Sequence, residues 1–258
     1  MLENFILGLI QGIAEWLPVS SEGIIVLVKT KFFGGAETEV LIREALFLHL
    51  GTFFAALVYF RKDVKKLLKF NSFDDSTKKL FSFLAIATVI SGAVGYVLLQ
   101  AIMALEDFVV IDAKRLMLVI GGLLLITAYL QFKSKKQLKG EKGIQKKDGI
   151  LLGLVQGLAV LPGLSRSGTT VATLLVRGYD DSLALKLSFL MSLPIVLAGN
   201  ILLNLGGLTF SVELAVGLVT AFVFGLLTID TLIRLTRKIN FGYFVLIFAL
   251  FSFIAAFI

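Results

Sequence analysis

The sequence predicts an all-α polytopic membrane protein made of two inverted-topology repeats, each a re-entrant helical hairpin plus three transmembrane helices. Three observations predict this fold class. The chain of 258 residues is 57% hydrophobic and 17% charged, with a mean hydropathy of +0.94, which is far more apolar than a soluble domain. Six apolar stretches are long enough to cross a bilayer. Two further segments, 1–36 and 149–180, are interrupted by proline, glycine and serine and resemble one another.

Each of the six apolar stretches has the length of about 20 residues that crosses about 30 Å of hydrocarbon. They lie near 40–60, 80–101, 115–132, 183–204, 212–234 and 241–258. Three segments predicted as loops hold 17 of the 25 Lys and Arg residues, at 61–79, 133–148 and 234–238. Basic loops mark the cytoplasmic side, so we expect a multi-pass protein of the cell (plasma) membrane. The acidic 105–112, the uncharged 206–210, the N-terminal region and the C-terminus then face outward.

The two interrupted segments match at an offset of 145 residues. GLIQGIA at 8–14 aligns with GLVQGLA at 153–159, and after a one-residue gap Ser21 falls opposite Ser165. This internal repeat divides a single membrane domain, 1–258, into repeat one at 1–132, a basic linker at 133–148 and repeat two at 149–258. Three spans follow each interrupted segment, and because three is odd, the second copy enters from the opposite face.

Broken helices at matching points of two inverted halves indicate a site near the midplane of the membrane. Non-helical backbone at that depth is tolerated only where it is buried in protein or lines a watery cavity. The alternative is that both segments are ordinary kinked spans, which would give eight crossings.

The composition excludes several kinds of site and partner. The chain has no cysteine and one histidine, which excludes disulfides, thiolate metal sites and a histidine cage, so any bound metal must use oxygen ligands. The net charge is +7, but its concentration in short loops indicates topology, and we expect no nucleic-acid partner. We also expect no removable signal peptide, because no short apolar segment ends in a small-residue cleavage site.

The second interrupted segment reads LPGLSRSGTTVATLLVRG at 161–178. Pro162 and Gly163 are expected to stop the incoming helix, and hydroxyls and free backbone N–H groups at the start of the next helix form an anion cradle. The cradle comprises Ser165, Ser167, Gly168, Thr169 and Thr170. Arg166 is the only cation expected at depth, where such a residue is by default functional, and its fork suits phosphate oxygens. Alternatively, Arg166 pairs with a glutamate of the first hairpin, Glu15 or Glu22, and the two roles can coexist.

The first interrupted segment supplies Glu15, Ser20, Ser21 and Glu22. Its two carboxylates are expected to hold an oxygen-liganded divalent cation, Mg²⁺ or Ca²⁺, to act as a general base, or both. Ser21 is a candidate nucleophile, or only a hydrogen-bond donor. Ser20 is a candidate for binding the substrate phosphate, and its simpler role is a cap on the following helix.

Three polar residues lie within the apolar spans. His49 either donates a hydrogen bond between helices or reaches the edge of the site. Asp230 is expected to pair with Arg234, one turn further on. Asn200 has no partner that the sequence identifies.

Two stretches carry a family resemblance. Residues 11–24 read QGIAEWLPVSSEGI and residues 162–170 read PGLSRSGTT. They resemble E-G-x-[ST]-E-[FW]-[LI]-P-[VI]-S-S-[ST]-G-H and P-G-x-S-R-S-G-x-T, the two signatures of the undecaprenyl-pyrophosphate phosphatase family of the bacitracin-resistance type. The second match is complete. HLGT at 49–52 and VYFRKD at 58–63 are also similar to the family.

The resemblance implies hydrolysis of a polyprenyl (undecaprenyl-type) diphosphate to the monophosphate lipid carrier and inorganic phosphate. It also implies a divalent cation and a site open toward the outer face. Carried over by position, Glu15 is the catalytic or metal-binding carboxylate and Ser21 the nucleophile. Arg166 is the diphosphate clamp, assisted by Ser165, Ser167 and Thr170.

Two of the departures from the family pattern matter, because each replaces a residue that could take part in the chemistry. Gln11 stands where the family has a glutamate, and it can still bind a metal or phosphate oxygen weakly. Ile24 stands where the family has a histidine, and it cannot accept a proton. Glu22 and His49 are hypothesised to supply the missing carboxylate and imidazole.

The sequence therefore favours phosphoanhydride hydrolysis in an intramembrane pocket, with an isoprenoid diphosphate lipid and the membrane as partners, and it leaves a homodimer open. A rival from another class is a lipid-phosphate transporter, because inverted repeats around a midplane anion site also describe alternating-access carriers. A purely structural scaffold leaves the lone arginine at depth unexplained.

Overall fold

The computed structural model describes residues 1–34, 38–69, 74–106, 113–134, 142–161, 163–204, 211–240 and 242–257. Within these ranges the protein is all helical, as predicted. The helices are α1 (Leu2–Ala14), α2 (Ser21–Phe32), α3 (Thr38–Tyr59), α4 (Arg61–Leu68), α5 (Asp75–Glu106), α6 (Ala113–Ser134), α7 (Lys146–Leu158), α8 (Arg166–Val176), α9 (Asp181–Asn204), α10 (Val212–Lys238) and α11 (Gly242–Ala255). The segments 107–112 and 205–210 and the helix-stopping Pro162 lie outside the described residues.

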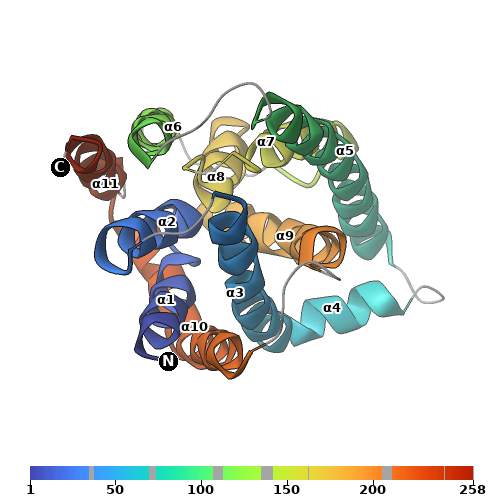
Figure 1. The fold of residues 1–258 in the computed structure, drawn as a ribbon. Coiled ribbons are helices and arrows are strands. Elements are labelled where there is room, and N and C mark those ends of the chain that lie inside the picture. Colours follow the sequence, from blue (N-terminus) through green and yellow to red (C-terminus); the bar gives the residue numbers. More distant parts are fainter. Residues whose placement is uncertain are drawn as a thin grey trace.

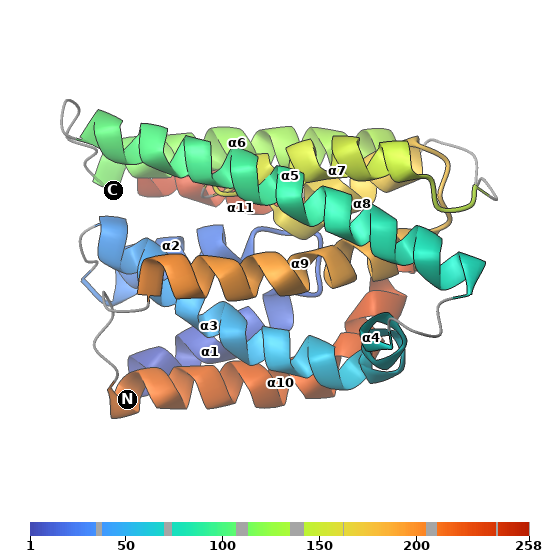
Figure 2. The same ribbon diagram turned by 90° about the vertical axis from the view of Figure 1, so that its right-hand side faces the viewer.

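All six predicted apolar stretches are helices. Four of them, α3, α5, α9 and α10, are long and apolar enough to cross a membrane, and α6 and α11 are apolar but shorter within the described residues. The long helices run roughly alongside one another (Figure 2). The protein is therefore a multi-pass membrane protein.

The predictions that 61–79 and 234–238 are loops were wrong, because 234–238 is the last turn of α10 and the first half of 61–79 forms α4. This helix has no fully buried side chain, and it lies across the end of the bundle rather than along it (Figures 1 and 2). Its apolar Val64 and Leu67 pack on the edge of the core, while its lysines and its arginine face away from the core. A basic amphipathic helix of this kind is typical of a membrane interface.

Two pairs of short helices differ from the spans. The helices α1, α2, α7 and α8 have 13, 12, 13 and 11 residues, which at 1.5 Å per residue is about 20 Å at most. None of them reaches across about 30 Å of hydrocarbon. In Figure 2 the pair α1 and α2 lies toward the end of the bundle that carries the N-terminus, and α7 and α8 lie toward the opposite end.

Glycines let the first helix of each pair touch a long helix, backbone against backbone. A Cβ atom on Gly8 would lie 2.3 Å from the carbonyl oxygen of Gly217 in α10, and one on Gly12 would lie 2.9 Å from that of Ala221. On α7, a Cβ atom on Gly153 would lie 2.9 Å from the carbonyl oxygen of Ala87 in α5. Small residues allow such close approach between membrane helices.

We predict that Gly8→Ala destabilises the protein, because α1 and α10 must separate to admit the methyl group. Overpacking costs about 1–3 kcal/mol, and the apparent Tm in detergent should fall. Gly122→Ala is the control, since a Cβ atom there meets nothing within 4 Å, and its Tm should stay level or rise. Equal Tm values for the two variants would contradict the close contact of α1 with α10.

A cluster of ion pairs surrounds Asp148 in the first turn of α7. The carboxylate of Asp148, which is 1% exposed, accepts hydrogen bonds from Lys142 at 2.6 Å, Arg177 at 2.9 Å and Tyr179 at 2.8 Å. Burial acts to raise the pKa of Asp148, but these donors outweigh it and the pKa is lowered. The ionised carboxylate therefore stabilises the fold.

This cluster predicts a pH dependence of stability. A carboxyl group with a lowered pKa in the folded state contributes stability above its ordinary pKa of 3.8, and the contribution is lost as the pH falls through the folded pKa. Asp148→Asn should therefore lower the apparent Tm at pH 7. The gap between wild type and variant should narrow below about pH 4. A gap that is constant with pH would show that the charge of Asp148 is not the cause.

Candidate functional site

The two short helix pairs meet tip to tip inside the bundle. Ser167 Oγ donates a hydrogen bond to the carbonyl oxygen of Leu17 at 3.0 Å. A Cβ atom on Gly168 would lie 3.0 Å from the carbonyl oxygen of Pro18, and one on Gly23 would lie 3.4 Å from the Cα atom of Gly163. The loops of the two predicted hairpins are therefore in direct contact.

Matching serines cap the helices that start at this junction. Ser20 Oγ accepts from the N–H of Gly23 at 3.1 Å, and Ser165 Oγ accepts from the N–H of Gly168 at 3.0 Å. The cap role proposed for Ser20 is confirmed. The caps also pair Ser20 with Ser165, one residue away from the sequence match of Ser21 with Ser165.

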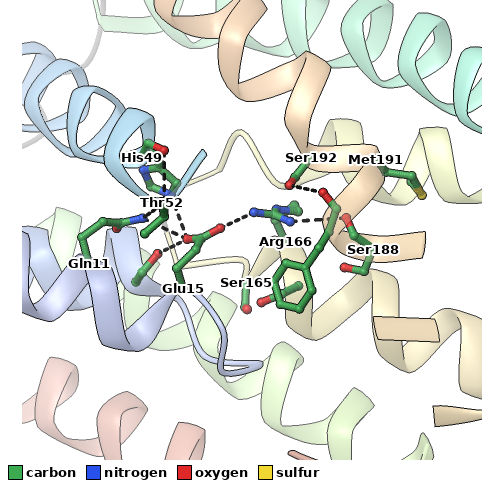
Figure 3. A network of polar contacts seen from close by, with 12 residues as sticks. Gln11, Glu15, His49, Thr52, Ser165, Arg166, Ser188, Met191 and Ser192 are labelled. Carbon is green, nitrogen blue, oxygen red and sulfur yellow. Dashed lines mark hydrogen bonds and ion pairs between the residues drawn. The ribbon is translucent and has the colours of Figure 1, made fainter. Parts of the chain in front are cut away.

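Glu15 is the centre of a buried polar network (Figure 3). Its Oε1 forms an ion pair with Arg166 Nη2. Its Oε2 accepts hydrogen bonds from Gln11 Nε2 at 3.0 Å and Ser21 Oγ at 2.9 Å, and it lies 3.3 Å from His49 Nε2. One carboxylate thus brings together four predicted site residues from α1, α2, α3 and α8.

The histidine has two oxygen neighbours. Its Nδ1 lies 2.7 Å from the carbonyl oxygen of Ala45, and its Nε2 faces Glu15. Since both neighbours are acceptors when Glu15 is ionised, an imidazole that donates from both nitrogens satisfies them. His49 therefore brings an imidazole to Glu15, which Ile24, at the histidine position of the family pattern, cannot do.

Arg166 sits between the first helix pair and α9. Its Nη1 donates to the carbonyl oxygen of Ser188 at 3.4 Å, and its guanidinium carbon lies 5.9 Å from the centroid of the Phe189 ring. Phe189 in turn packs edge-on against Trp16, with 5.3 Å between the centroids of the two rings. The predicted pairing of Arg166 with Glu15 is present, and it holds the two helix pairs together.

The remaining cradle residues bond mostly within α8. Thr169 Oγ1 donates to the carbonyl oxygen of Ser165 at 2.8 Å, and Thr170 Oγ1 donates to that of Arg166 at 2.7 Å. The hydroxyl of Thr170 also lies 2.7 Å from that of Ser188. These contacts fix the start of α8 and with it the position of Arg166.

A small cavity of about 10 Å³ adjoins the network, which is room for about one water molecule. The cavity is lined by Glu15, Trp16, His49, Thr52, Phe53, Ala56, Arg166, Ser192, Leu193 and Val196. Sequence reasoning missed Trp16, Thr52 and Ser192 as site residues. A signal existed for Ser192, because Ser188 and Ser192 are spaced to share one face of α9.

Oxygen atoms near Glu15 are the available metal ligands. Among the residues that the structure describes, no group of three or more His, Asp or Glu side chains is placed to hold a metal ion. Gln11 Oε1, however, is a buried acceptor without a hydrogen-bond partner in the described part of the chain. Glu22 follows Ser21, whose Oγ donates to Glu15 at 2.9 Å, in the first turn of α2. Mg²⁺ commonly binds one or two carboxylates together with substrate phosphates, and Glu15, Glu22 and Gln11 offer oxygen donors of that kind.

The other membrane polar residues also have partners. Asp230 pairs with Arg234 at 2.9 Å, as predicted, and accepts a hydrogen bond from the Tyr59 hydroxyl at 3.0 Å. Asn200 donates to the carbonyl oxygen of Leu46 on α3 at 2.9 Å. This partner could not be identified from sequence, because it is a backbone atom on a distant helix.

Comparison with known proteins gives strong matches along nearly the whole chain. The family model described as "Bacitracin resistance protein BacA" matches residues 4–254. A protein named undecaprenyl-diphosphatase from Methanococcoides burtonii is 41% identical over 250 residues, which cover 94% of this chain and 93% of the relative. Proteins of the same name from Haloarcula marismortui and Desulforudis audaxviator are 40% and 37% identical, with 93% and 95% of this chain and 92% of each relative covered.

Proposed function

Because the chain belongs to the bacitracin resistance protein BacA family, we propose that it is an undecaprenyl-diphosphatase. The enzyme hydrolyses undecaprenyl diphosphate to undecaprenyl monophosphate and inorganic phosphate. The observation that carries the proposal is the Glu15 network, in which a buried guanidinium, a carboxylate and a serine hydroxyl converge at the junction of the two helix pairs. Those are the groups that phosphoryl transfer needs, namely a clamp for anionic oxygens, a proton acceptor and a nucleophile.

In this mechanism Arg166 exchanges part of its contact with Glu15 for the oxygens of the terminal phosphate. The guanidinium then neutralises the charge that develops on those oxygens. Glu15 accepts the proton of Ser21 Oγ, or of a water molecule in its place, and the oxygen attacks the terminal phosphorus. The phosphoanhydride bond breaks, and its bridging oxygen leaves with the undecaprenyl monophosphate. If a phosphoserine forms, a water molecule releases inorganic phosphate from it.

A divalent cation, Mg²⁺ or Ca²⁺, is part of the proposal. Glu15 and Glu22 would hold it, with Gln11 Oε1 as a further oxygen ligand, and it would neutralise charge on the diphosphate. His49 holds Glu15 in place from the side away from Arg166.

The proposal includes the fold: two re-entrant hairpins related as an inverted repeat. Residues at the offset of 145 occupy matching environments, which supports this architecture. Gly8 packs on α10 as Gly153 packs on α5, and Gln11 and Gln156 are both buried with an unpartnered Oε1 among the described residues. Glu3 and Asp148 are also 145 residues apart, and each forms an ion pair at the base of its hairpin, Glu3 with Lys29 at 3.2 Å and Asp148 with Arg177 at 2.9 Å.

The proposed orientation puts the three basic segments in the cytoplasm. Helix α4, the C-terminal end of α10 and the ends of α6 and α7 on either side of the basic linker lie at the same end of the bundle (Figure 2). Basic residues concentrate on the cytoplasmic side of membrane proteins. The first hairpin then enters from the outer face, and the site opens toward it.

The test is release of inorganic phosphate by the purified protein in detergent, with undecaprenyl diphosphate as substrate. Activity that a chelator abolishes and Mg²⁺ or Ca²⁺ restores is expected. A protein that binds the lipid without releasing phosphate would be a carrier, and the proposal would be wrong.

Ser21→Ala is expected to lower kcat by about 10²-fold or more, the range for a lost proton-transfer or nucleophilic group. Ser252→Ala is the matched control, because Ser252 is equally buried but bonds to the carbonyl oxygen of Met117, in the pair α6 and α11. Acid quenching with substrate labelled in the terminal phosphate separates the two nucleophiles. If the label stays on the wild-type protein and not on Ser21→Ala, the attacking group is the serine. Full activity of Ser21→Ala would exclude any catalytic role for Ser21.

A further inference from the structure

Helix α9 changes character at Pro194. The seven residues before it, from Leu187 to Leu193, are all buried, whereas from Pro194 to the end of the helix only Asn200 and Asn204 are buried. A proline inside a helix removes one backbone hydrogen bond and weakens the helix at that point. The helix therefore has an anchored half and a lightly packed half.

Three side-chain hydrogen bonds tie the lightly packed half to α3. Asn200 Nδ2 donates to the carbonyl oxygen of Leu46 at 2.9 Å, and Asn204 Nδ2 donates to that of Arg43 at 3.1 Å. Arg43 Nη1 donates in the opposite direction, to the carbonyl oxygen of Leu203. Apolar contact gives little drive to associate helices inside a bilayer, so these polar contacts decide whether the two helices stay together.

The contacts lie next to the catalytic cavity. The cavity is lined by His49 and Thr52 from α3 and by Ser192 and Val196 from α9, on both sides of Pro194. Its volume of about 10 Å³ holds about one water molecule and not a diphosphate group. The cavity must therefore widen before a diphosphate group reaches Arg166, and α3 and α9 form two of its walls.

We propose that the second half of α9, residues 195–204, is a gate that swings away from α3 about Pro194, with Arg43, Asn200 and Asn204 as its latch. The gate opens the cavity toward the end of the bundle that carries the N-terminus (Figure 2). The headgroup of the lipid diphosphate enters between α3 and α9, and the phosphate product leaves the same way. The three latch residues are positioning residues for the proposed hydrolysis, on which this inference rests.

A reversible crosslink tests the gate, and the chain contains no native cysteine. The variant Leu46→Cys/Gly199→Cys joins the two helices, since a Cβ atom on Gly199 would lie 3.5 Å from Leu46 Cδ2. Joining the two cysteines with a short bis-thiosulfonate reagent should lower the rate of hydrolysis of undecaprenyl diphosphate by at least about tenfold, as for an enzyme whose lid cannot open. Reduction should restore the rate.

The matched control is Asp63→Cys/Lys186→Cys, which joins the anchored half of α9 to α4 where the native side chains lie 2.6 Å apart. Its crosslinking should leave the rate unchanged. Full activity of the closed 46–199 crosslink would overturn the gate, whereas a wild-type protein without hydrolysis would overturn the proposed function instead.

A second measurement is independent of activity. Val196→Cys places a thiol in the cavity lining, and its rate of alkylation reports how often the cavity is open. Adding Asn200→Ala should raise that rate by about threefold to tenfold, the change expected for one lost interhelical hydrogen bond. Adding Asp63→Ala should leave the rate unchanged. An alkylation rate that does not respond to Asn200→Ala would overturn the latch.

Discussion

Arg166→Ala is expected to lower kcat/KM for undecaprenyl diphosphate by about 10³-fold, the scale for removing a group that stabilises transition-state charge. Arg166 is the only cation of α8, and the adjoining cavity has room for about one water molecule. Little water can therefore enter to replace the contribution of the guanidinium. The measurement is phosphate release by purified protein at saturating and limiting substrate.

Loss of folding must be separated from loss of catalysis. Removing Arg166 leaves the buried carboxylate of Glu15 without its ion-pair partner, which costs about 3–5 kcal/mol of stability. Arg166→Lys keeps the positive charge, yet loses the planar fork that matches phosphate oxygens. It should fold normally and remain strongly impaired. Arg234→Ala is the control, because that side chain is 72% exposed. Wild-type activity of Arg166→Lys would contradict the bidentate clamp.

Glu15→Gln should have the second largest effect, again about 10³-fold on kcat, within the range for a lost general base. The amide keeps the shape of the side chain, but it cannot take a proton from Ser21 and cannot balance the charge of Arg166. Rates with and without Mg²⁺ should become similar if the carboxylate also holds the cation. Glu44→Gln is the matched control, since Glu44 pairs with Lys29 away from the site.

Comparison with Glu22→Gln and His49→Ala assigns the compensating roles. If Glu15→Gln keeps full activity while Glu22→Gln loses it, the proton acceptor is Glu22 and the mechanism must be rewritten around that residue. Unchanged rates in both Glu22→Gln and His49→Ala would end the idea that they replace the glutamate and histidine of the family pattern.

The fold was largely predictable because a bilayer imposes simple length and polarity rules. Every apolar stretch of about 20 residues is a helix, and proline, glycine and serine marked the two interrupted segments. The helix α4 was missed because seven basic residues in 61–79 suggested a loop, although Val64 and Leu67 have the spacing of an amphipathic helix.

The site was easiest to predict where a charged residue stands at membrane depth. Glu15 and Arg166 could be identified because burying them is costly without a function or a partner. Trp16 and Thr52 could not, since they join the cavity only through the packing of the helices. For Ser192 the four-residue spacing from Ser188 on α9 was a signal that was not used. Aligning letters placed Ser21 opposite Ser165, whereas the two serines that share the role of helix cap are Ser20 and Ser165.

The packing of the glycine-rich helices has a consequence for biosynthesis. Helix α1 rests on α10, and α7 rests on α5, so each half of the chain supplies the surface on which the other half's hairpin lies. During translation α5 is already in place when α7 emerges, but α1 must wait for residues 212–238. Helix α1 is thus made long before α10, and until then α2 and α3 are the described helices against which it can pack.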